Sequence, residues 1–191
     1  MKIKLLIISL LFVFKCSLAK DMEPVVPYYE WGFCIGEKCE ISGEWRVTDA
    51  ITTYKKRDIN GQVAFKLRKD DTVTAITEVI ISSKIGVVKV NKPIKLHVLD
   101  ASKDFGDIEL KVKQGDIIYN LRPWGEGFDL CQFKGKRYLI ELPPLPEYGY
   151  VTSQPELQVI SEPEYVEWVK LKNHNGQVGW ALRENLDDHS Y

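Results

Sequence analysis

The chain has 191 residues, with 26 basic and 27 acidic side chains and a formal net charge of -1 at pH 7. Nucleic acid and anionic lipid are not expected as partners of such a protein, because they attract surfaces with clustered positive charge. The length suffices for one large domain or for two to three small ones.

The first residues have the pattern of a secretory signal peptide. Lys2 and Lys4 give a basic start, residues 5–14 form an apolar run in which only Ser9 is polar, and small residues end at Ala19. This pattern predicts cleavage after Ala19, so that residues 1–19 are removed. The apolar run is too short to cross a bilayer, which takes roughly 20 residues.

A buried core helix and a lipid-modified Cys16 are the alternatives to a cleaved signal. Lipidation needs a small residue before the cysteine, whereas the charged Lys15 stands there. Removal of residues 1–19 would leave 23 basic and 27 acidic residues. No second apolar stretch approaches the length of a membrane span, so we expect a secreted or periplasmic protein without membrane insertion.

Residues 20–44 form an N-terminal segment with a cysteine pair. Cys34 and Cys39 are separated by four residues that include Gly36, and a short turn there can bring the two sulfurs together. In an exported protein we therefore expect a disulfide between them. No metal or cofactor is expected, because the three histidines lie far apart in the sequence with no ligand motif around them.

The rest of the chain is predicted to be all-β. Short runs of alternating polarity recur, rich in Val, Ile, Thr and Tyr, and long helical periodicity is missing. Such alternation places one face of each strand in a core and the other in water. The clearest runs are residues 72–77, 94–99, 108–112 and 166–171. Turn signals between the runs, of which Asn175-Gly176 is the strongest, favour small barrels or sandwiches.

The sequence matches itself at an offset of 45 residues. Identical residues then coincide and the apolar positions keep the same alternation: Gly61 with Gly106, Val63 with Ile108, Phe65 with Leu110, Lys66 with Lys111, Leu67 with Val112, Asp71 with Asp116, Val73 with Ile118, and Ile76 with Leu121. We interpret the match as an internal duplication of a strand, a charged turn and a second strand. We expect Phe65 and Leu110 to be buried in their own cores, and Asp71 and Asp116 to lie exposed at matching corners.

These residues resemble bacterial SH3-like domains. Lys113-Gln114-Gly115-Asp116 between two strands is similar to the middle of such a domain, and residues 168–180, which run from a Trp-Val-Lys strand through Asn-Gly to Gly-Trp, are similar to its closing hairpin. The resemblance implies tandem SH3-like barrels. The first copy departs from the pattern, because Asp70 stands where the turn glycine belongs and no Gly-Trp ending follows.

The resemblance divides the chain into modules. Residues 45–92 form the first SH3-like module, residues 93–142 the second, and residues 143–191 a Pro-rich joint followed by a C-terminal SH3-like β unit. The prolines of the joint cannot donate to a sheet ladder, which favours a linker. Pro143 and Pro146 also have the spacing of a polyproline ligand, an alternative that the sequence leaves open.

No motif for catalysis stands out in the sequence. There is no glycine-flanked serine elbow, and no phosphate-cradling glycine loop. Cys131 lies within an apolar stretch and is expected to be a buried free thiol, although a dyad with His97 or His174 can be imagined. We therefore do not expect an enzyme.

Aromatic residues are the best candidates for binding. Tyr29 and Trp31 crowd before the cysteine pair, and Trp124 stands on a glycine-flanked turn beside Glu126. Aromatic rings next to polar groups are typical of peptide and glycan sites. Trp168 and Trp180, by contrast, are expected in the core.

We predict an exported, non-catalytic module that recognises a peptide or a cell-wall component in the cell envelope. The partner would be a peptide, peptidoglycan or a segment of another protein, bound between SH3-like barrels. The alternative is a structural or interaction protein of an envelope or secreted complex.

Overall fold

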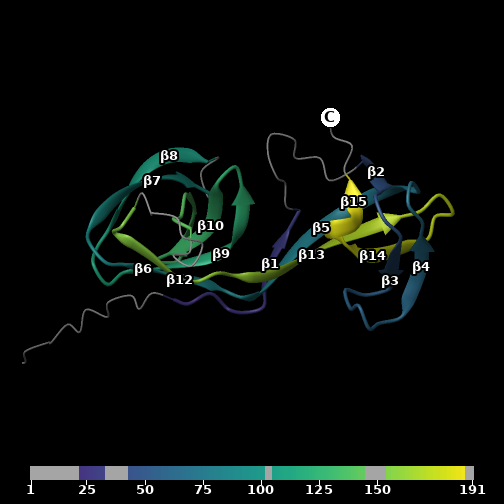
Figure 1. Cartoon of the computed structure of the whole chain (residues 1–191), viewed down its shortest axis with the longest axis horizontal. Helices are drawn as coiled ribbons and strands as arrows, with labels where there is room; N and C mark the ends of the chain where they lie inside the picture. Colours follow the sequence, from purple (N-terminus) through teal and green to yellow (C-terminus); the bar gives the residue numbers. More distant parts are fainter. Residues whose placement is uncertain (1–21, 33–42, 102–104, 145–153, 188–191) are drawn as a thin grey trace, which may run out of the picture.

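The computed structural model describes residues 22–32, 43–101, 105–144 and 154–187. These residues form an all-β structure of two antiparallel sheets, as the sequence predicted, with no α-helix among them. Figure 1 shows the sheets at opposite ends of an elongated molecule, joined by two long strands that run side by side. The only helical element in the described ranges is a short 3-10 turn, η2 (Arg183–Asn185).

The first sheet combines strands from both ends of the chain. Its order is β15 (Leu186–Asp187), β2 (Gly43–Val47), β5 (Thr72–Lys84), β13 (Glu164–Lys172), β14 (Val178–Leu182), β3 (Ile51–Tyr54) and β4 (Val63–Leu67). An eighth strand, β1 (Tyr28–Trp31), pairs with the end of β5. The long β5 thus lies between β13 on one side and β2 and β1 on the other.

The second sheet is built from one continuous stretch of chain. Its order is β12 (Leu157–Ser161), β6 (Gly86–Val90), β9 (Ile117–Gly125), β10 (Phe128–Phe133), β11 (Lys136–Ile140), β7 (Ile94–Asp100) and β8 (Gly106–Val112). β5 leads directly into β6, and β12 leads into β13. Two chain crossings therefore connect the sheets.

The expectation of closed barrels is wrong for the described residues. In the first sheet the end strands β15 and β4 do not pair, and in the second β12 and β8 do not pair. β15 has two described residues, which pair with β2. β12 continues toward the first sheet, so its direction is fixed by that connection. Both sheets are open antiparallel sheets.

The two sheets share one strand order and one register. β2, β5, β13, β14, β3, β4 and β15 correspond in turn to β6, β9, β10, β11, β7, β8 and β12. Ala75 of β5 and Asn120 of β9 occupy equivalent positions. Each pairs with a glycine of one neighbouring strand, and on the other neighbouring strand each pairs with the residue that directly follows a register shift. The pairs are Gly43 with Ala75, Leu171 with Ala75, Gly86 with Asn120, and Cys131 with Asn120.

This equivalence places one copy of the fold inside the other. The second copy, β6 to β12, is continuous, and it is inserted between β5 and β13 of the first copy. The C-terminal segment forms no sheet of its own among the described residues, because β12 completes the second copy and β13 to β15 complete the first. Gly179-Trp180 lies in β14, which belongs to the first copy.

The match at offset 45 is confirmed by the strand positions. Phe65 lies in β4 and Leu110 in the equivalent β8. Phe65 is buried, but Leu110 is only half-buried against its core, contrary to expectation. Asp71 and Asp116 are half-buried as well, because each carboxylate accepts a hydrogen bond from a backbone N–H of its own turn.

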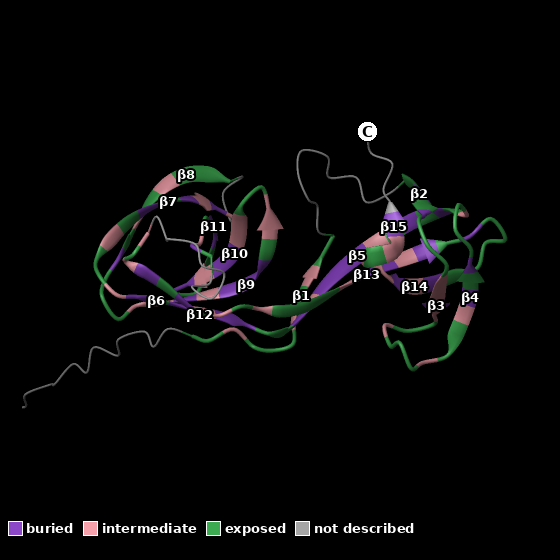
Figure 2. Ribbon diagram, in the orientation of Figure 1, coloured by how far each residue is buried: buried purple, intermediate pink, exposed green. Residues whose placement is uncertain are grey.

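Each copy has its own core, and Figure 2 shows buried residues in both sheets. The core of the first copy includes Trp45, Phe65 and Val169, and that of the second copy includes Ile118, Cys131 and Ile140. A third cluster on the other face of the second sheet contains Ile85, Leu121, Leu130 and Leu139. Because Ile85 joins β5 to β6, this third cluster lies beside the connection between the sheets.

Candidate functional site

Strand β1 carries two of the predicted binding residues. Trp31 pairs with Val79 of β5, which pairs on its other side with Trp168, and Tyr29 pairs in the same way with Ile81. Directly opposed residues in an antiparallel sheet lie on the same face. Tyr29 and Trp31 therefore project from the face opposite to the core of the first copy, and they are 45% and 53% exposed.

Aromatic and basic side chains gather on this face. We define the outer aromatic face by Tyr29, Trp31, Tyr54, Arg57, Trp168, Lys170 and Trp180. The Trp31 and Trp180 rings meet edge to face with 6.2 Å between centroids, as do the rings of Tyr54 and Trp168. Trp168 is buried, whereas Trp180 is partly exposed. The expected burial is confirmed for Trp168, although its ring lies on the face opposite to the core of the first copy, and it is wrong for Trp180.

Arg57 is the centre of the outer aromatic face. Its guanidinium carbon lies 4.8 Å from the ring centroid of Trp31, 5.2 Å from that of Trp180 and 5.7 Å from that of Tyr29. The ring faces attract the cation and hold it in place. Its Nη1 atom is buried and has no hydrogen-bond partner among the described residues. A second cation, Lys170, lies 5.9 Å from the Trp180 ring.

β1 is also an edge strand, because among the described residues it pairs only with β5. The Gly32 N–H donates to the Glu78 carbonyl at 3.1 Å, so the backbone of Glu30, two residues earlier, also faces β5. Hydrogen-bonded and non-hydrogen-bonded pairs alternate in an antiparallel ladder. The backbone groups of Tyr29 and Trp31 therefore face away from β5, where no strand of the described part of the chain pairs with them.

The other two predicted binding residues lie elsewhere. Trp124 lies near the end of β9 in the second sheet, where its ring is tilted against that of Phe105 and lies 4.5 Å from the Arg122 guanidinium carbon. Glu126 is exposed in the following turn at a φ of 53°. Tyr29 and Trp31 therefore lie on the same face of the first sheet, whereas Trp124 and Glu126 lie in the second sheet and the turn that follows β9.

Sequence reasoning missed Arg57 and the placement of Trp180. A usable signal was the alternation in β13, where Val169 and Leu171 are buried in the core. Lys170 between them must then point to the opposite face, and Trp180 pairs with Lys170. Arg57 gave no such signal, since it lies in the loop between β3 and β4.

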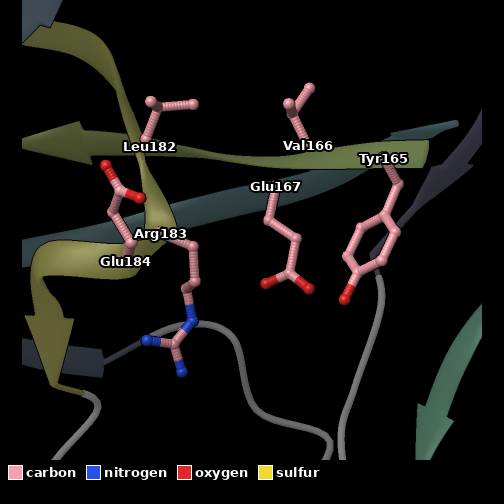
Figure 3. A pocket seen from close by; sticks show the side chains of 6 residues that line it. All are labelled: Tyr165, Val166, Glu167, Leu182, Arg183 and Glu184. Carbon is pink, nitrogen blue, oxygen red and sulfur yellow. The ribbon is translucent and has the colours of Figure 1, made fainter. Parts of the chain in front are cut away.

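A charged cleft lies on the opposite side of the same strands. It has a volume of about 360 Å³, and Figure 3 shows Tyr165, Glu167 and Arg183 pointing to one side of the ribbon and Val166 to the other. Burial raises the pKa of Glu167, and the charges of Arg183 and Arg122 oppose that effect. Arg183 Nε is 3.7 Å from an oxygen of the buried Glu78.

Charged groups also tie β1 to the second sheet. The Tyr28 hydroxyl donates to the Glu30 carboxylate, and Arg137 Nη1 lies 3.5 Å from the other Glu30 oxygen. Arg122 is fully buried nearby, and its burial lowers its pKa to about 10 despite the charge of Glu30. These contacts fix the side of β1 that faces away from the outer aromatic face.

The cysteines contribute no site within the described ranges. Cys34 and Cys39 lie outside the described residues, so their disulfide stays a prediction. Cys131 is a buried free thiol, and burial raises its pKa well above the usual range, which disfavours the reactive thiolate. No group of three or more His, Cys, Asp or Glu side chains comes together among the residues that the structure covers.

Comparison of the chain with protein-family models, curated proteins and solved structures gives no match. Among the described segments, no helix has the length and apolar character needed to cross a bilayer.

Proposed function

We propose that the protein is a non-catalytic binding module that takes up an extended peptide along the free edge of β1. The observation that carries the proposal is the pair of exposed aromatic rings, Tyr29 and Trp31, on an edge strand beside Arg57. Addition of a peptide strand to an exposed sheet edge is a common mode of recognition, in which main-chain hydrogen bonds give affinity and side-chain pockets give specificity.

The outer aromatic face would supply the specificity. In an added strand every second side chain projects over this face, next to Trp31 and Tyr29. Arg57 and Lys170 are cations at that place, and the surrounding rings limit the access of water to the Arg57 guanidinium. The face therefore favours a peptide with an acidic side chain or a terminal carboxylate.

We also propose the setting predicted from the sequence. The chain would be exported, with residues 1–19 removed, and would act in the cell envelope on peptidoglycan stem peptides or on a segment of a partner protein. The Lys-Gln-Gly-Asp turn and the Trp168–Trp180 hairpin support the proposal that the two copies are divergent SH3-like modules. N-terminal sequencing of the exported protein should begin at Lys20, and a start at Cys16 would contradict it.

The binding proposal is tested by titrating the chain from Lys20 onward with stem peptides released from purified peptidoglycan, followed by tryptophan fluorescence. We expect saturable binding that Trp31→Ala and Arg57→Ala each weaken about tenfold, because truncating a central aromatic or arginine anchor costs about 1–2 kcal/mol or more. Phe105→Ala is the control, since Phe105 is an exposed aromatic residue that directly precedes β8 of the second sheet.

Two outcomes would contradict the peptide proposal. Equal effects of Phe105→Ala and Trp31→Ala would remove the assignment to the outer aromatic face. Binding to peptidoglycan glycan strands freed of their peptides, with no binding of the peptides, would identify a glycan-binding protein instead, because aromatic faces also stack on sugar rings.

Exposed sheet edges support one alternative, an assembly protein whose edges pair with copies of itself. β4 and β8 each pair with only one strand in the described part of the chain, and Val63 of β4 is 45% exposed. Such edges are templates for strand pairing between chains. Size-exclusion chromatography with light scattering distinguishes the two functions, since a monomer at all concentrations excludes assembly through these edges.

A further inference from the structure

A second cavity, distinct from the outer aromatic face, lies where the second copy meets the chain that returns to the first sheet. It has a volume of about 320 Å³, within the range of small-ligand pockets. Leu142, Pro143, Pro144 and Pro163 form apolar walls, and Asn120, Asp129, Glu162 and Tyr165 are the lining residues with polar side chains. We call it the proline-walled cavity.

The inner end of the cavity is closely packed. A Cβ atom at Gly86 would lie 2.9 Å from Pro163 Cδ and 3.0 Å from Asn120 Cβ, so only glycine allows Pro163 to approach β9 this closely. Asn120 itself is only 6% exposed. Gly86 of β6 is thus closely packed against Pro163 and Asn120, two of the residues that line the cavity.

Asn120 is a buried polar side chain with an unsatisfied acceptor. Its Nδ2 donates to Asp129 Oδ1 at 2.9 Å, whereas its buried Oδ1 has no hydrogen-bond partner among the described residues. A buried amide oxygen without a partner costs about 1–3 kcal/mol. Such groups need an explanation, which a hydrogen-bond donor in the cavity would supply.

The first copy of the fold provides an internal comparison. Ala75 and Val169 occupy the positions of Asn120 and Asp129, and both are buried in the apolar core of the first copy. The fold therefore does not require polar residues at these two positions. The second copy has a hydrogen-bonded polar pair there, at the end of its core that opens into the cavity.

The charge of the cavity identifies the ligand class. Asp129 and Glu162 are carboxylic acids, Asn120 Oδ1 is an acceptor without a partner among the described residues, and none of the described residues that line the cavity is basic. Burial, together with the nearby charge of Glu162, raises the pKa of Asp129 to about 6. A cation beside Asp129 would offset this cost, and apolar walls suit an aliphatic chain attached to it.

We propose that the proline-walled cavity binds an alkylammonium group, with the ammonium between Asp129, Glu162 and the Asn120 Oδ1 atom and the alkyl chain against the prolines. The group could come from a free small amine or from a lysine side chain of a partner. Both sources present the same three N–H donors on a hydrocarbon stem. The site is independent of the outer aromatic face.

The test is calorimetric titration with butylammonium, with Nα-acetyl-lysine amide and with the neutral analogue butanol. We expect binding of the two cations at about millimolar concentration and none of butanol. Tighter binding of the lysine derivative would identify a partner side chain as the source, and tighter binding of butylammonium would identify a free amine. No binding of either cation, or equal binding of butanol, would overturn the proposal.

Variants locate the site. Asp129→Asn keeps the side-chain shape and should weaken butylammonium binding at least about tenfold, because it removes the charge of a charge-assisted hydrogen bond. The double variant Asn120→Ala with Asp129→Val carries the residues of the first copy and should not bind. Glu109→Gln, an exposed carboxylate of β8, and Trp31→Ala are the controls. Wild-type affinity in a folded Asp129→Asn variant would overturn the assignment.

Binding should also depend on pH through Asp129. The titratable groups around it are Glu162, Tyr165 and Cys131, and the pKa values of Tyr165 and Cys131 are raised. Butylammonium affinity should fall as the pH drops through about 6, where Asp129 takes up a proton. Asp129→Asn should remove this dependence, and an unchanged profile in that variant would contradict the role of Asp129.

Discussion

At the scale of single residues, two turns in the two copies have the same hydrogen bonds. The Asp71 carboxylate accepts the Arg68 N–H at 2.7 Å, and the Asp116 carboxylate accepts the Lys113 N–H at 2.9 Å. The sequence predicted exposed aspartates at these corners, but each carboxylate accepts a hydrogen bond from the backbone of its own turn and is half-buried. Side chains of this type often satisfy turn N–H groups.

We expect Asp71→Ala and Asp116→Ala each to lower the free energy of unfolding by about 0.5–1.5 kcal/mol, because each removes one hydrogen bond to its turn. Urea denaturation measures the change. Glu109→Ala is the control, since its contact with Lys95 is an exposed ion pair of small value. Losses no larger than that of the control would contradict the role of the two aspartates.

The residue before each of these aspartates has a left-handed backbone. Asp70 has a φ of 67° and its equivalent Gly115 a φ of 88°. A side chain in this region costs roughly 1–2 kcal/mol, less for Asp. We expect Gly115→Ala to destabilise by about 1 kcal/mol and Asp70→Gly to stabilise modestly. Gly43→Ala is the control, because nothing lies within 4 Å of the added Cβ. Thermal unfolding measures the change, and a larger loss of stability in Gly43→Ala than in Gly115→Ala would contradict this prediction.

Asp129 gives the protein a pH-dependent stability. Its pKa is raised from 3.8 to about 6, so the folded protein binds more protons than the unfolded chain between these values. Stability should therefore fall as the pH rises from about 4 to about 6, by a contribution on the order of 2 kcal/mol. Urea denaturation at about pH 4 and at about pH 6 should show a smaller fall in the free energy of unfolding for Asp129→Asn than for the wild type. The same fall in both proteins would contradict the prediction.

At the scale of elements, equivalent strands are not buried equally. β4 and β8 are both end strands, yet Phe65 is 8% exposed while Leu110 is only partly covered. The repeat therefore conserves the register more closely than the packing. The two cores are filled by different residues.

We expect Phe65→Ala to lower the free energy of unfolding by about 3–5 kcal/mol, the range for a buried phenylalanine. Leu110→Ala should cost less than the ~2–5 kcal/mol of a buried leucine, because solvent already reaches its side chain. Chemical denaturation of both variants gives the comparison. A larger loss for Leu110→Ala than for Phe65→Ala would contradict the burial seen here.

At the scale of the whole molecule, one copy of the fold interrupts the other. The second copy contains all of its strands between Gly86 and Ser161, whereas β5 and β3 of the first copy need β13 and β14 from the distant C-terminal segment. Independent folding requires a complete set of neighbouring strands around one core.

We expect residues 86–161 to fold as an isolated fragment and residues 43–84 to remain unfolded, because the latter lack the strands that cover β5 and β3. Dispersion of amide resonances measures folding. Joining residues 43–84 to residues 164–187 by a Gly-Ser linker should give a folded protein, because it brings β13 and β14 back to β5 and β3. A folded 43–84 fragment would contradict the nested arrangement.

The sequence by itself determined the all-β class, the positions of most strands and the equivalence of residues 45 apart, because alternation and turn residues act locally. It also predicted Tyr29 and Trp31 as binding residues, and the structure shows that both are exposed. Only the tertiary structure decided that the Trp168–Trp180 hairpin belongs to the first copy, since strand partners distant in sequence leave no local pattern. Only the tertiary structure likewise showed the position of Arg57, the exposure of Trp180 and the hydrogen bond between Asn120 and Asp129. Which face of an alternating strand is covered depends on the neighbours that the fold places there.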